Sequence, residues 1–233
     1  MMAVGRPGPD ESALLEPFRD KVPAEVFGEP YVPPVSDGSG QDRALLRKAS
    51  ALLREAGYVI RDGKRETPQN ELFTVELLVD DPISLPHHNA FIKNLGILGI
   101  EANVRVVDPV QYRNRVDDFD FDIVVQRFGF SSTPGDSLRT FFTSRAAAMR
   151  GSQNVGGISD PVIDALVERV IAAQSRPALL AACKALDRVI RSGRYWVPHW
   201  YKAFRWLAYW DVFGRPEAQP RYDPAIRETW WAA

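Results

Sequence analysis

"ELFTVELLVDD", residues 71–81, is a run of apolar and β-branched residues that is long enough to form a strand. Two later runs, "EANVRVVD" at 101–108 and "FDFDIVVQRF" at 119–128, predict strands as well. The segments between them, "ISLPHHNAFIKNLGILGI" (83–100) and "PVQYRNRVDD" (109–118), predict helices. Strand, helix, strand, helix, strand with short connections predicts a βαβαβ unit. The fold class is therefore α/β, with a mostly parallel sheet flanked by helices.

Helical periodicity recurs on both sides of this unit. "DRALLRKASALLREAGY" (42–58) carries an apolar stripe at the helical period, with Asp42 suited to cap its start and Gly57 to take a left-handed conformation at its end. "DPVIDALVERVIAAQ" (160–174) and "RPALLAACKALDRVIRSG" (176–193) predict two more helices. Apolar residues surround Cys183 in the last of these, which predicts a buried structural thiol.

The two ends of the chain have distinct compositions. Seven of the 18 prolines fall in the first 34 residues, and residues 36–40 read "SDGSG". Because proline fixes φ and lacks an N–H donor, we expect residues 1–40 to form an extended arm and residues 41–233 to form the main lobe. The other end, "YWVPHWYKAFRWLAYWDVFG" (195–214), predicts aromatic strands whose rings lie mostly in the core.

Composition excludes several classes of partner. The chain of 233 residues has 29 Lys and Arg against 30 Asp and Glu. It therefore lacks the excess of positive charge that attracts nucleic acids. No apolar run reaches the roughly 18–20 residues of a membrane-spanning helix. The start, "MMAVGRPGPDESALLEPF", lacks the features of a signal peptide, so the chain as given is expected in the cytoplasm.

The loop "FGFSSTPGD" (128–136) follows the third predicted strand and raises the possibility of a serine hydrolase. Ser131 would be the nucleophile, followed by Asp164 or Asp187 and then His199, which is the order of an α/β hydrolase. The nucleophile elbow needs Gly-x-Ser-x-Gly, and Thr133 stands where the second glycine is required. The broken motif argues against a nucleophilic Ser131.

Metal and cofactor motifs are equally weak. His87 and His88 lie near Asp80 and Asp81, but adjacent helical side chains point about 100° apart and do not share a ligand face. A solvated helix start explains the two histidines better than a metal site. The sequence contains neither a P-loop nor Gly-x-Gly-x-x-Gly, so we expect no metal and no cofactor.

Three long stretches resemble a known family in the same order. They run from "LGILGIEANVRVVD" to "FGFSSTPGD" (95–136), over "SQNVGGISDPVIDALVERVIAAQ" (152–174), and from "ACKALDRVI" to "WDVFGRP" (182–216). The chain resembles the C-terminal half of family 5 extracellular solute-binding proteins, the oligopeptide, dipeptide and nickel receptors of ABC importers. It looks most like the branch associated with oligopeptide and microcin C-like peptide uptake.

The resemblance implies a type II periplasmic-binding-protein-like lobe that meets an N-terminal lobe, with ligand enclosed between them. The N-terminal lobe and the signal peptide would precede this chain. By the same resemblance, Arg127, Phe128, Phe130 and Ser131 are expected to contact a peptide-like ligand. Relatives often carry at the position of Ser131 an aspartate that pairs with the ligand's ammonium group, and serine lacks that charge.

The resemblance also implies partners and a location. The intact receptor would be periplasmic and would dock on the permease of an ABC importer after its lobes close around ligand. It would have no enzymatic activity. Two alternatives remain open at this point: a serine hydrolase that uses Ser131, and a truncated fragment without function that exposes the surface meant for the other lobe.

Overall fold

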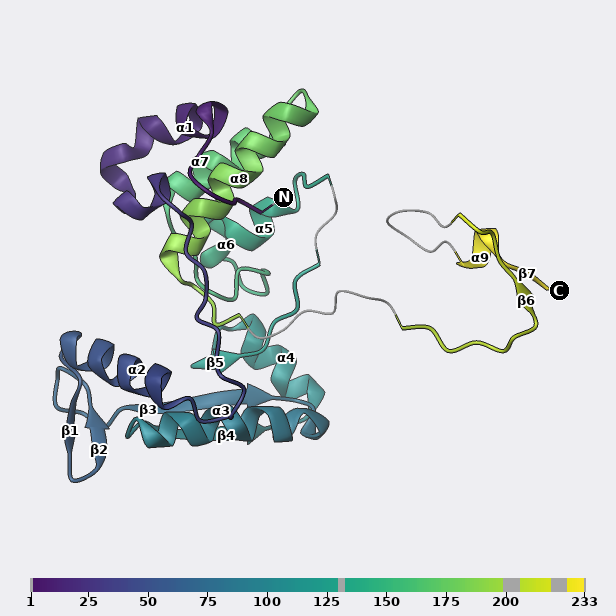
Figure 1. The fold of residues 1–233 in the computed structure, drawn as a ribbon. Helices are drawn as coiled ribbons and strands as arrows, with labels where there is room; N and C mark the ends of the chain where they lie inside the picture. The colour runs from purple at the N-terminus through teal and green to yellow at the C-terminus, as the bar shows by residue number, and fades with distance from the viewer. Residues whose placement is uncertain (1, 130–132, 199–205, 219–225, 233) are drawn as a thin grey trace. The chain divides into compact units, whose positions relative to one another are not determined.

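The computed structural model describes residues 2–129, 133–198, 206–218 and 226–232 (Figure 1). The chain divides into two compact units, Met1–Val197 and Pro198–Ala233. The residues expected to form a separate arm, 1–40, therefore fall within the first unit, and the predicted lobe of residues 41–233 is divided after Val197.

The first unit contains a parallel sheet of three strands, as predicted. β3 (Thr74–Val79) lies between β4 (Glu101–Val106) and β5 (Ile123–Val124), and it is parallel to both. Leu77, Leu78 and Val79 are buried, so the apolar half of the sequence run forms the centre of the sheet. The hydrophobic effect thus selects this run as the central strand.

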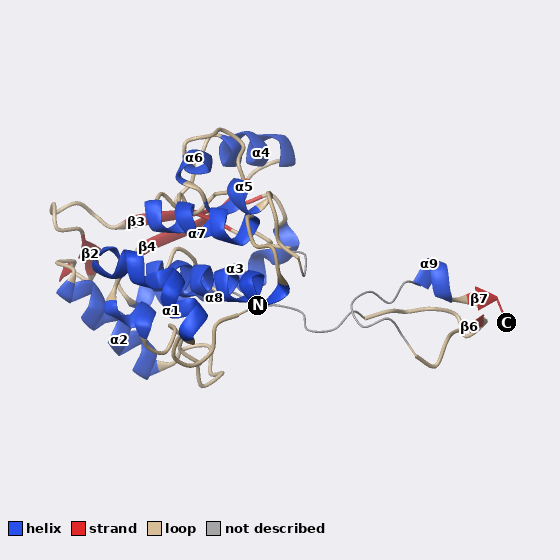
Figure 2. Ribbon diagram, turned by 90° about the horizontal axis from the view of Figure 1, so that it is seen from above, coloured by secondary structure: helices blue, strands red, loops and turns tan. Residues whose placement is uncertain are grey.

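Two crossover helices connect the parallel strands, and they place the following strands on opposite sides of β3. α3 (Leu85–Ile97) joins β3 to β4, and α4 (Pro109–Asp117) joins β4 to β5 on the far side of β3. Figures 1 and 2 show the two helices on opposite faces of the sheet. The strand order therefore reverses beside β3, and the carboxyl ends of β3 and β5 flank a topological switch point. Ligands of open α/β sheets bind at such points.

A second layer of the first unit consists of helices. α5 (Leu138–Phe142), α6 (Ser144–Ala147), α7 (Pro161–Ile171) and α8 (Arg176–Gly193) follow the sheet in the chain. Asp160 and Ser175 cap α7 and α8 by accepting hydrogen bonds from backbone N–H groups of their first turns. Their apolar stripes form one buried cluster. Cys183 belongs to this cluster, as predicted, and burial raises the pKa of its thiol.

The N-terminal segment is more helical than predicted. α1 (Pro9–Leu15), η1 (Glu16–Lys21) and η2 (Ala24–Phe27) lie within the expected extended arm, so that expectation is wrong for residues 9–21 and 24–27. The prolines are compatible with helix here because Pro9 and Pro17 stand in the first turns of α1 and η1, where an N–H donor is not needed.

A helix and a hairpin precede the sheet. α2 (Arg43–Glu55) begins at Asp42, whose side chain accepts hydrogen bonds from two backbone N–H groups, and Gly57 beyond its end has φ +87°, both as predicted. β1 (Val59–Arg61) and β2 (Lys64–Glu66) then pair antiparallel. The buried Arg65 donates hydrogen bonds to the carbonyl oxygens of Leu98 and Tyr58 and to the hydroxyl of Ser50. This arginine fastens the hairpin to α2 and to the end of α3.

The second unit contains a small antiparallel pair, β6 (Phe213–Gly214) with β7 (Trp231–Ala232), and the short helix α9 (Ile226–Thr229). The predicted aromatic strands are wrong for residues 206–212, which are irregular. The prediction of buried rings is wrong for Trp206 and Trp210, which are 82% and 83% exposed. A strand needs a hydrogen-bonding partner, and within the described part of this unit β7 pairs only with Phe213 and Gly214.

Candidate ligand-binding site

The segment that leaves β5 carries the predicted ligand contacts. Arg127 and Phe128 are exposed beyond the carboxyl end of the strand. Within the described ranges, Arg127 makes neither a hydrogen bond nor an ion pair, so no described group uses its five guanidinium donors. Phe130 and Ser131, the other two predicted contacts, lie outside the described residues.

Phe128 packs against rings of the helical layer. Its ring centroid is 5.2 Å from that of Trp196 and 5.9 Å from that of Phe141, and Trp196 also contacts the buried Phe142 at 6.0 Å. The Phe128 residue is nevertheless 37% exposed. Phe128 therefore packs against the helical layer and still has exposed surface. Sequence reasoning missed Phe141 and Trp196 as supports of this loop.

Polar contacts hold the start of the same loop. The Gln126 side chain donates a hydrogen bond to Gln153 at 3.1 Å, which ties the loop to the segment between α6 and α7. The backbone N–H of Gly151 donates to the carbonyl oxygen of Asp117 at 2.9 Å. These contacts fix the base of the loop, because each joins the sheet layer to the helical layer.

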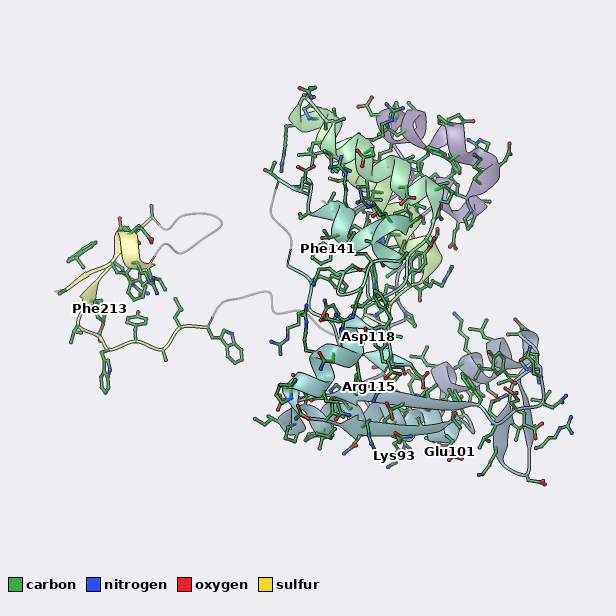
Figure 3. The ribbon with its side chains drawn as sticks, turned by 180° about the vertical axis from the view of Figure 1, so that it is seen from behind. Lys93, Glu101, Arg115, Asp118, Phe141 and Phe213 are labelled. Atoms are coloured by element: carbon green, nitrogen blue, oxygen red, sulfur yellow. The ribbon has the colours of Figure 1, made fainter. Side chains whose placement is uncertain are left out.

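The end of α4 forms a second link between the layers (Figure 3). Asp118 pairs with Arg150, and the hydrogen bond from Arg150 lowers the pKa of the Asp118 carboxyl. One turn earlier, Arg115 pairs with Glu76 of β3 at 2.9 Å and with Asp120 at 2.8 Å. The end of α4 is thus fixed both to the central strand β3 and to the turn that follows α6.

Three aspartates follow the other strands at the same edge. Asp81 accepts a hydrogen bond from the N–H of Ile83, and Asp108 caps α4 through the N–H groups of Val110 and Gln111. Asp80 is exposed and takes part in neither cap. In the sequence alone, Asp80 and Asp81 stand out only as weak candidates for metal ligands.

Tyr112 of α4 lies at this edge as well. Its hydroxyl is 3.5 Å from the carbonyl oxygen of Val125, directly before the exposed loop. Burial raises the pKa of the Tyr112 hydroxyl, and the negative charge of Asp80 raises it further. The tyrosine therefore lies near both the end of β3 and the end of β5, and it stays neutral at physiological pH.

The alternatives raised by the sequence find little support in the described residues. Within them, no group of three His, Cys, Asp or Glu side chains is arranged to hold a metal ion. The expected solvated helix start fits His87, which is exposed, but is wrong for His88, which is buried because it lies on the inner face of α3. No helix in the described ranges is long and apolar enough to span a membrane.

The acids of the hydrolase hypothesis have structural roles. Asp164 accepts a hydrogen bond from the N–H of Ser144, and Asp187 pairs with Arg191 at 2.8 Å and accepts a hydrogen bond from the N–H of Ala3. The proposed nucleophile Ser131 and base His199 lie outside the described residues. Both candidate acids are thus engaged with other groups, whereas a triad acid must orient the catalytic histidine.

Residues 12–149, more than half of the chain, match the family described as bacterial extracellular solute-binding proteins, family 5 (middle region). The chain belongs to this family. Proteins of family 5 are periplasmic receptors of ABC transporters, and several relatives of this chain are named as binding proteins. The parallel sheet and its flanking helices are those of a periplasmic binding protein, as the sequence predicted.

Two curated relatives match this family 5 chain along almost all of its length. An uncharacterized protein of Sinorhizobium fredii, y4wM, is 41% identical over 98% of this chain and 34% of its own length. The probable peptide-binding protein YejA of Agrobacterium fabrum is 36% identical over 98% of this chain and 37% of its own length. The chain therefore spans about a third of the length of these curated relatives.

A solved structure shows the same fold at lower identity. The oligopeptide-binding protein AppA of Bacillus subtilis, determined with a nonapeptide, superimposes with a TM-score of 0.61 at 16% sequence identity. The match covers 96% of this chain and 45% of AppA. At this identity the comparison establishes the fold, and the ligand of AppA is a property of that protein.

Proposed function

We propose that this chain is the C-terminal, ligand-binding part of a periplasmic receptor that delivers oligopeptides or modified peptides to an ABC importer. Membership of family 5 supports the transport role, and the printed name of the YejA relative supports a peptide-like ligand. The observation that carries the proposal is the exposed loop after β5, which presents Arg127 and Phe128 at the switch point of the sheet.

The two described side chains suit different parts of a peptide. The guanidinium of Arg127 is a planar donor that binds carboxylates and backbone carbonyl oxygens. The exposed part of the Phe128 ring offers an apolar surface whose position is fixed by Trp196 and Phe141. Phe130 and Ser131, which lie outside the described residues, enter the proposal only as an apolar and a polar side chain of the same loop. Together they favour a ligand with both a polar backbone and apolar side chains.

The proposal includes a second lobe. Because the chain spans about a third of its relatives, the surface that closes over the ligand belongs to a polypeptide segment outside these 233 residues. Hinge closure of two lobes around ligand would then create the form that docks on the permease. The chain alone is expected to bind peptide more weakly than the complete receptor, since only one side of the site is present.

Calorimetry and thermal unfolding with a library of short peptides test this function. A ligand that binds only the folded chain stabilises it by about 2.7 kcal/mol when present at 100 times its dissociation constant. For any peptide that raises the Tm, Arg127→Ala is expected to weaken binding about tenfold, because a charge-assisted hydrogen bond is lost. Arg105→Ala is the matched control, since Arg105 is an exposed arginine of β4 that is unpaired in the described structure.

Two results would contradict the proposal. A cooperative unfolding transition that no peptide shifts, even at millimolar concentration, would show that this chain does not recognise peptides. Equal weakening by Arg127→Ala and Arg105→Ala would show that binding depends on the general charge of the chain and not on the loop after β5.

A further inference from the structure

The edge strand β4 has one side without a partner in the described part of the chain. β3 lies between β4 and β5, so β4 is hydrogen-bonded on the β3 side only (Figure 1). The backbone N–H groups of Glu101 and Val107 donate hydrogen bonds toward β3. Because the direction of these groups alternates along a strand, the N–H and C=O groups of Ala102, Val104 and Val106 point to the free edge. Such a row of backbone groups can pair with another strand.

β4 lacks two of the usual features that keep an edge strand from pairing. It contains no proline, and its six residues pair with β3 in an uninterrupted register, so it has no bulge. It is also longer than β5 at the other edge of the sheet, which has two residues. The charges of Glu101 and Arg105 are the remaining obstacle to pairing, and their signs decide which strand fits.

The two charges of β4 are placed symmetrically about Asn103. Glu101 lies two residues before it and Arg105 two residues after it, and all three side chains are exposed on one face of the strand. In an antiparallel pair of two β4 strands centred on Asn103, Glu101 of each copy lies opposite Arg105 of the other. Ala102 then lies opposite Val104, and their outward backbone groups can exchange hydrogen bonds. Two cross-strand pairs of opposite charge stabilise this arrangement.

Other antiparallel registers lose this match. Pairing centred on Glu101 or on Arg105 places like charges opposite each other, which destabilises a sheet. Pairing centred on Ala102 or on Val104 leaves both charged residues opposite uncharged ones. Lys64 of the same chain pairs with Glu101 at 3.2 Å, but the Glu101 side chain stays 55% exposed. Arg105 forms no ion pair with any described residue, so a second copy would supply its carboxylate.

We propose that two copies of this chain associate through their β4 strands, antiparallel and centred on Asn103. The contact joins two three-stranded sheets into one continuous sheet, and it is isologous, because each copy contributes the same residues. A strand edge alone is a small interface, so the dimer is weak and forms at high protein concentration. β5 lies on the other side of β3, so this contact does not involve the loop that carries the proposed peptide site.

Sedimentation equilibrium of the full chain between about 5 and 500 micromolar tests the association. The average mass is expected to rise with concentration toward twice the mass of one chain. Arg105→Glu should weaken the dimer about tenfold, because like charges then face each other at two symmetric positions. Glu101→Arg should do the same, and the chain with both substitutions should recover the dimer, since opposite charges face each other again. Arg47→Glu, on the exposed face of α2, changes the net charge equally and should have no effect.

Cross-linking tests the register without a change of charge. In an antiparallel pair centred on residue 103, the two Cα atoms of that residue are about 4.5 Å apart, which suits a disulfide. Diamide takes up the two protons and two electrons that two thiols release, and it should link Asn103→Cys chains rapidly as dimers. Arg47→Cys is the exposed control and should be linked more slowly. The natural Cys183 is buried.

Each result bears on the proposal. A mass of one chain over the whole concentration range would overturn it, as would equal effects of Arg105→Glu and Arg47→Glu. The proposal is also overturned if the doubly substituted chain stays as weak as the single variants, or if Asn103→Cys and Arg47→Cys are linked at the same rate. Arg105→Ala should weaken the dimer and leave peptide binding unchanged, so failure of the dimer does not affect the proposed function.

Discussion

Arg188 joins segments that are far apart in the sequence. Its side chain is fully buried, pairs with Glu11 at 2.8 Å and donates hydrogen bonds to the carbonyl oxygens of Gly5 and Gly28. Burying a guanidinium is costly unless a carboxylate and further acceptors satisfy it. The N-terminal segment provides the carboxylate of Glu11 and the two carbonyl oxygens, and these contacts hold the segment against α8.

Removing the carboxylate leaves this buried charge uncompensated. Glu11→Ala is expected to lower the free energy of unfolding by about 3 kcal/mol, because breaking one partner of a buried pair costs more than the pair contributes. Chemical denaturation at neutral pH measures the change. Glu16→Ala is the control, since Glu16 pairs with Arg19 on the surface, where solvent screens the interaction. Equal effects of the two substitutions would contradict the buried role.

Residue-level predictions succeeded where the rule is local. Asp42 and Gly57 were recognised because a helix cap depends on positions within one turn. The buried roles of Arg65, Arg188 and His88 were missed, since each depends on packing or partners set by the fold. The sequence reveals that a residue is charged or aromatic, but it does not reveal which distant group lies opposite.

At the scale of elements, the sheet was predicted from local patterns, whereas the helical turns of the N-terminal segment were not. The βαβαβ unit follows from hydrophobic runs and short connections, and all its strands and helices appear in the predicted order. The helical turns of Pro9–Leu15 and Glu16–Lys21 were missed because proline was read as a breaker rather than as a first-turn residue. The ligand role of the loop after β5 followed from resemblance and stays a prediction, whereas the contact of Trp196 with Phe128 depends on packing that the sequence does not reveal.

The helix pair α7 and α8 depends on close packing of its apolar stripes. Leu166 of α7 has no exposed surface and lies in the main cluster. Leu166→Ala is expected to lower the free energy of unfolding by about 3 kcal/mol, as buried leucine truncations do when a cavity remains. Leu52→Ala removes the same atoms from the surface of α2, where leucine is 56% exposed, and should have little effect. Urea titrations of the two variants measure the difference in the free energy of unfolding, provided that their m-values are equal. A small effect of Leu166→Ala would contradict the buried position of Leu166 in this core.

A surface network links α5 to α7 and gives stability a pH dependence. Both carboxylate oxygens of Glu168 accept hydrogen bonds from Arg139 at 2.6 Å, and these bonds lower the pKa of Glu168. A lowered folded-state pKa stabilises the protein above the unfolded pKa of about 4.5. The stabilisation is lost as the pH falls through the folded-state value.

Glu168→Gln should therefore be less stable than the unmodified chain at pH 7, and the difference should shrink as the solution is acidified. Thermal unfolding at a series of pH values between neutral and strongly acidic measures this convergence. Glu55→Gln, which changes the charge without breaking an ion pair among the described residues, should show no such trend. A gap that is constant over the whole series would mean that the Glu168 charge does not contribute.

At the scale of the whole molecule, the two compact units differ in how they place their aromatic rings. In the first unit, Trp196 packs among Phe128, Phe142 and Tyr195. In the second, Trp230 packs against Tyr209 with ring centroids 4.7 Å apart. Trp206 and Trp210 are instead more than four-fifths exposed, although tryptophan usually buries a large apolar area.

This exposure makes a direct prediction for the intact chain in solution. Acrylamide should quench a large, red-shifted part of the tryptophan fluorescence, because a water-exposed indole is accessible to a small polar quencher. The double substitution Trp206→Phe and Trp210→Phe should remove most of that part, whereas Trp196→Phe should remove emission that is quenched less. If the double variant and the unmodified chain lose the same fraction of fluorescence to acrylamide, then something covers both rings in solution.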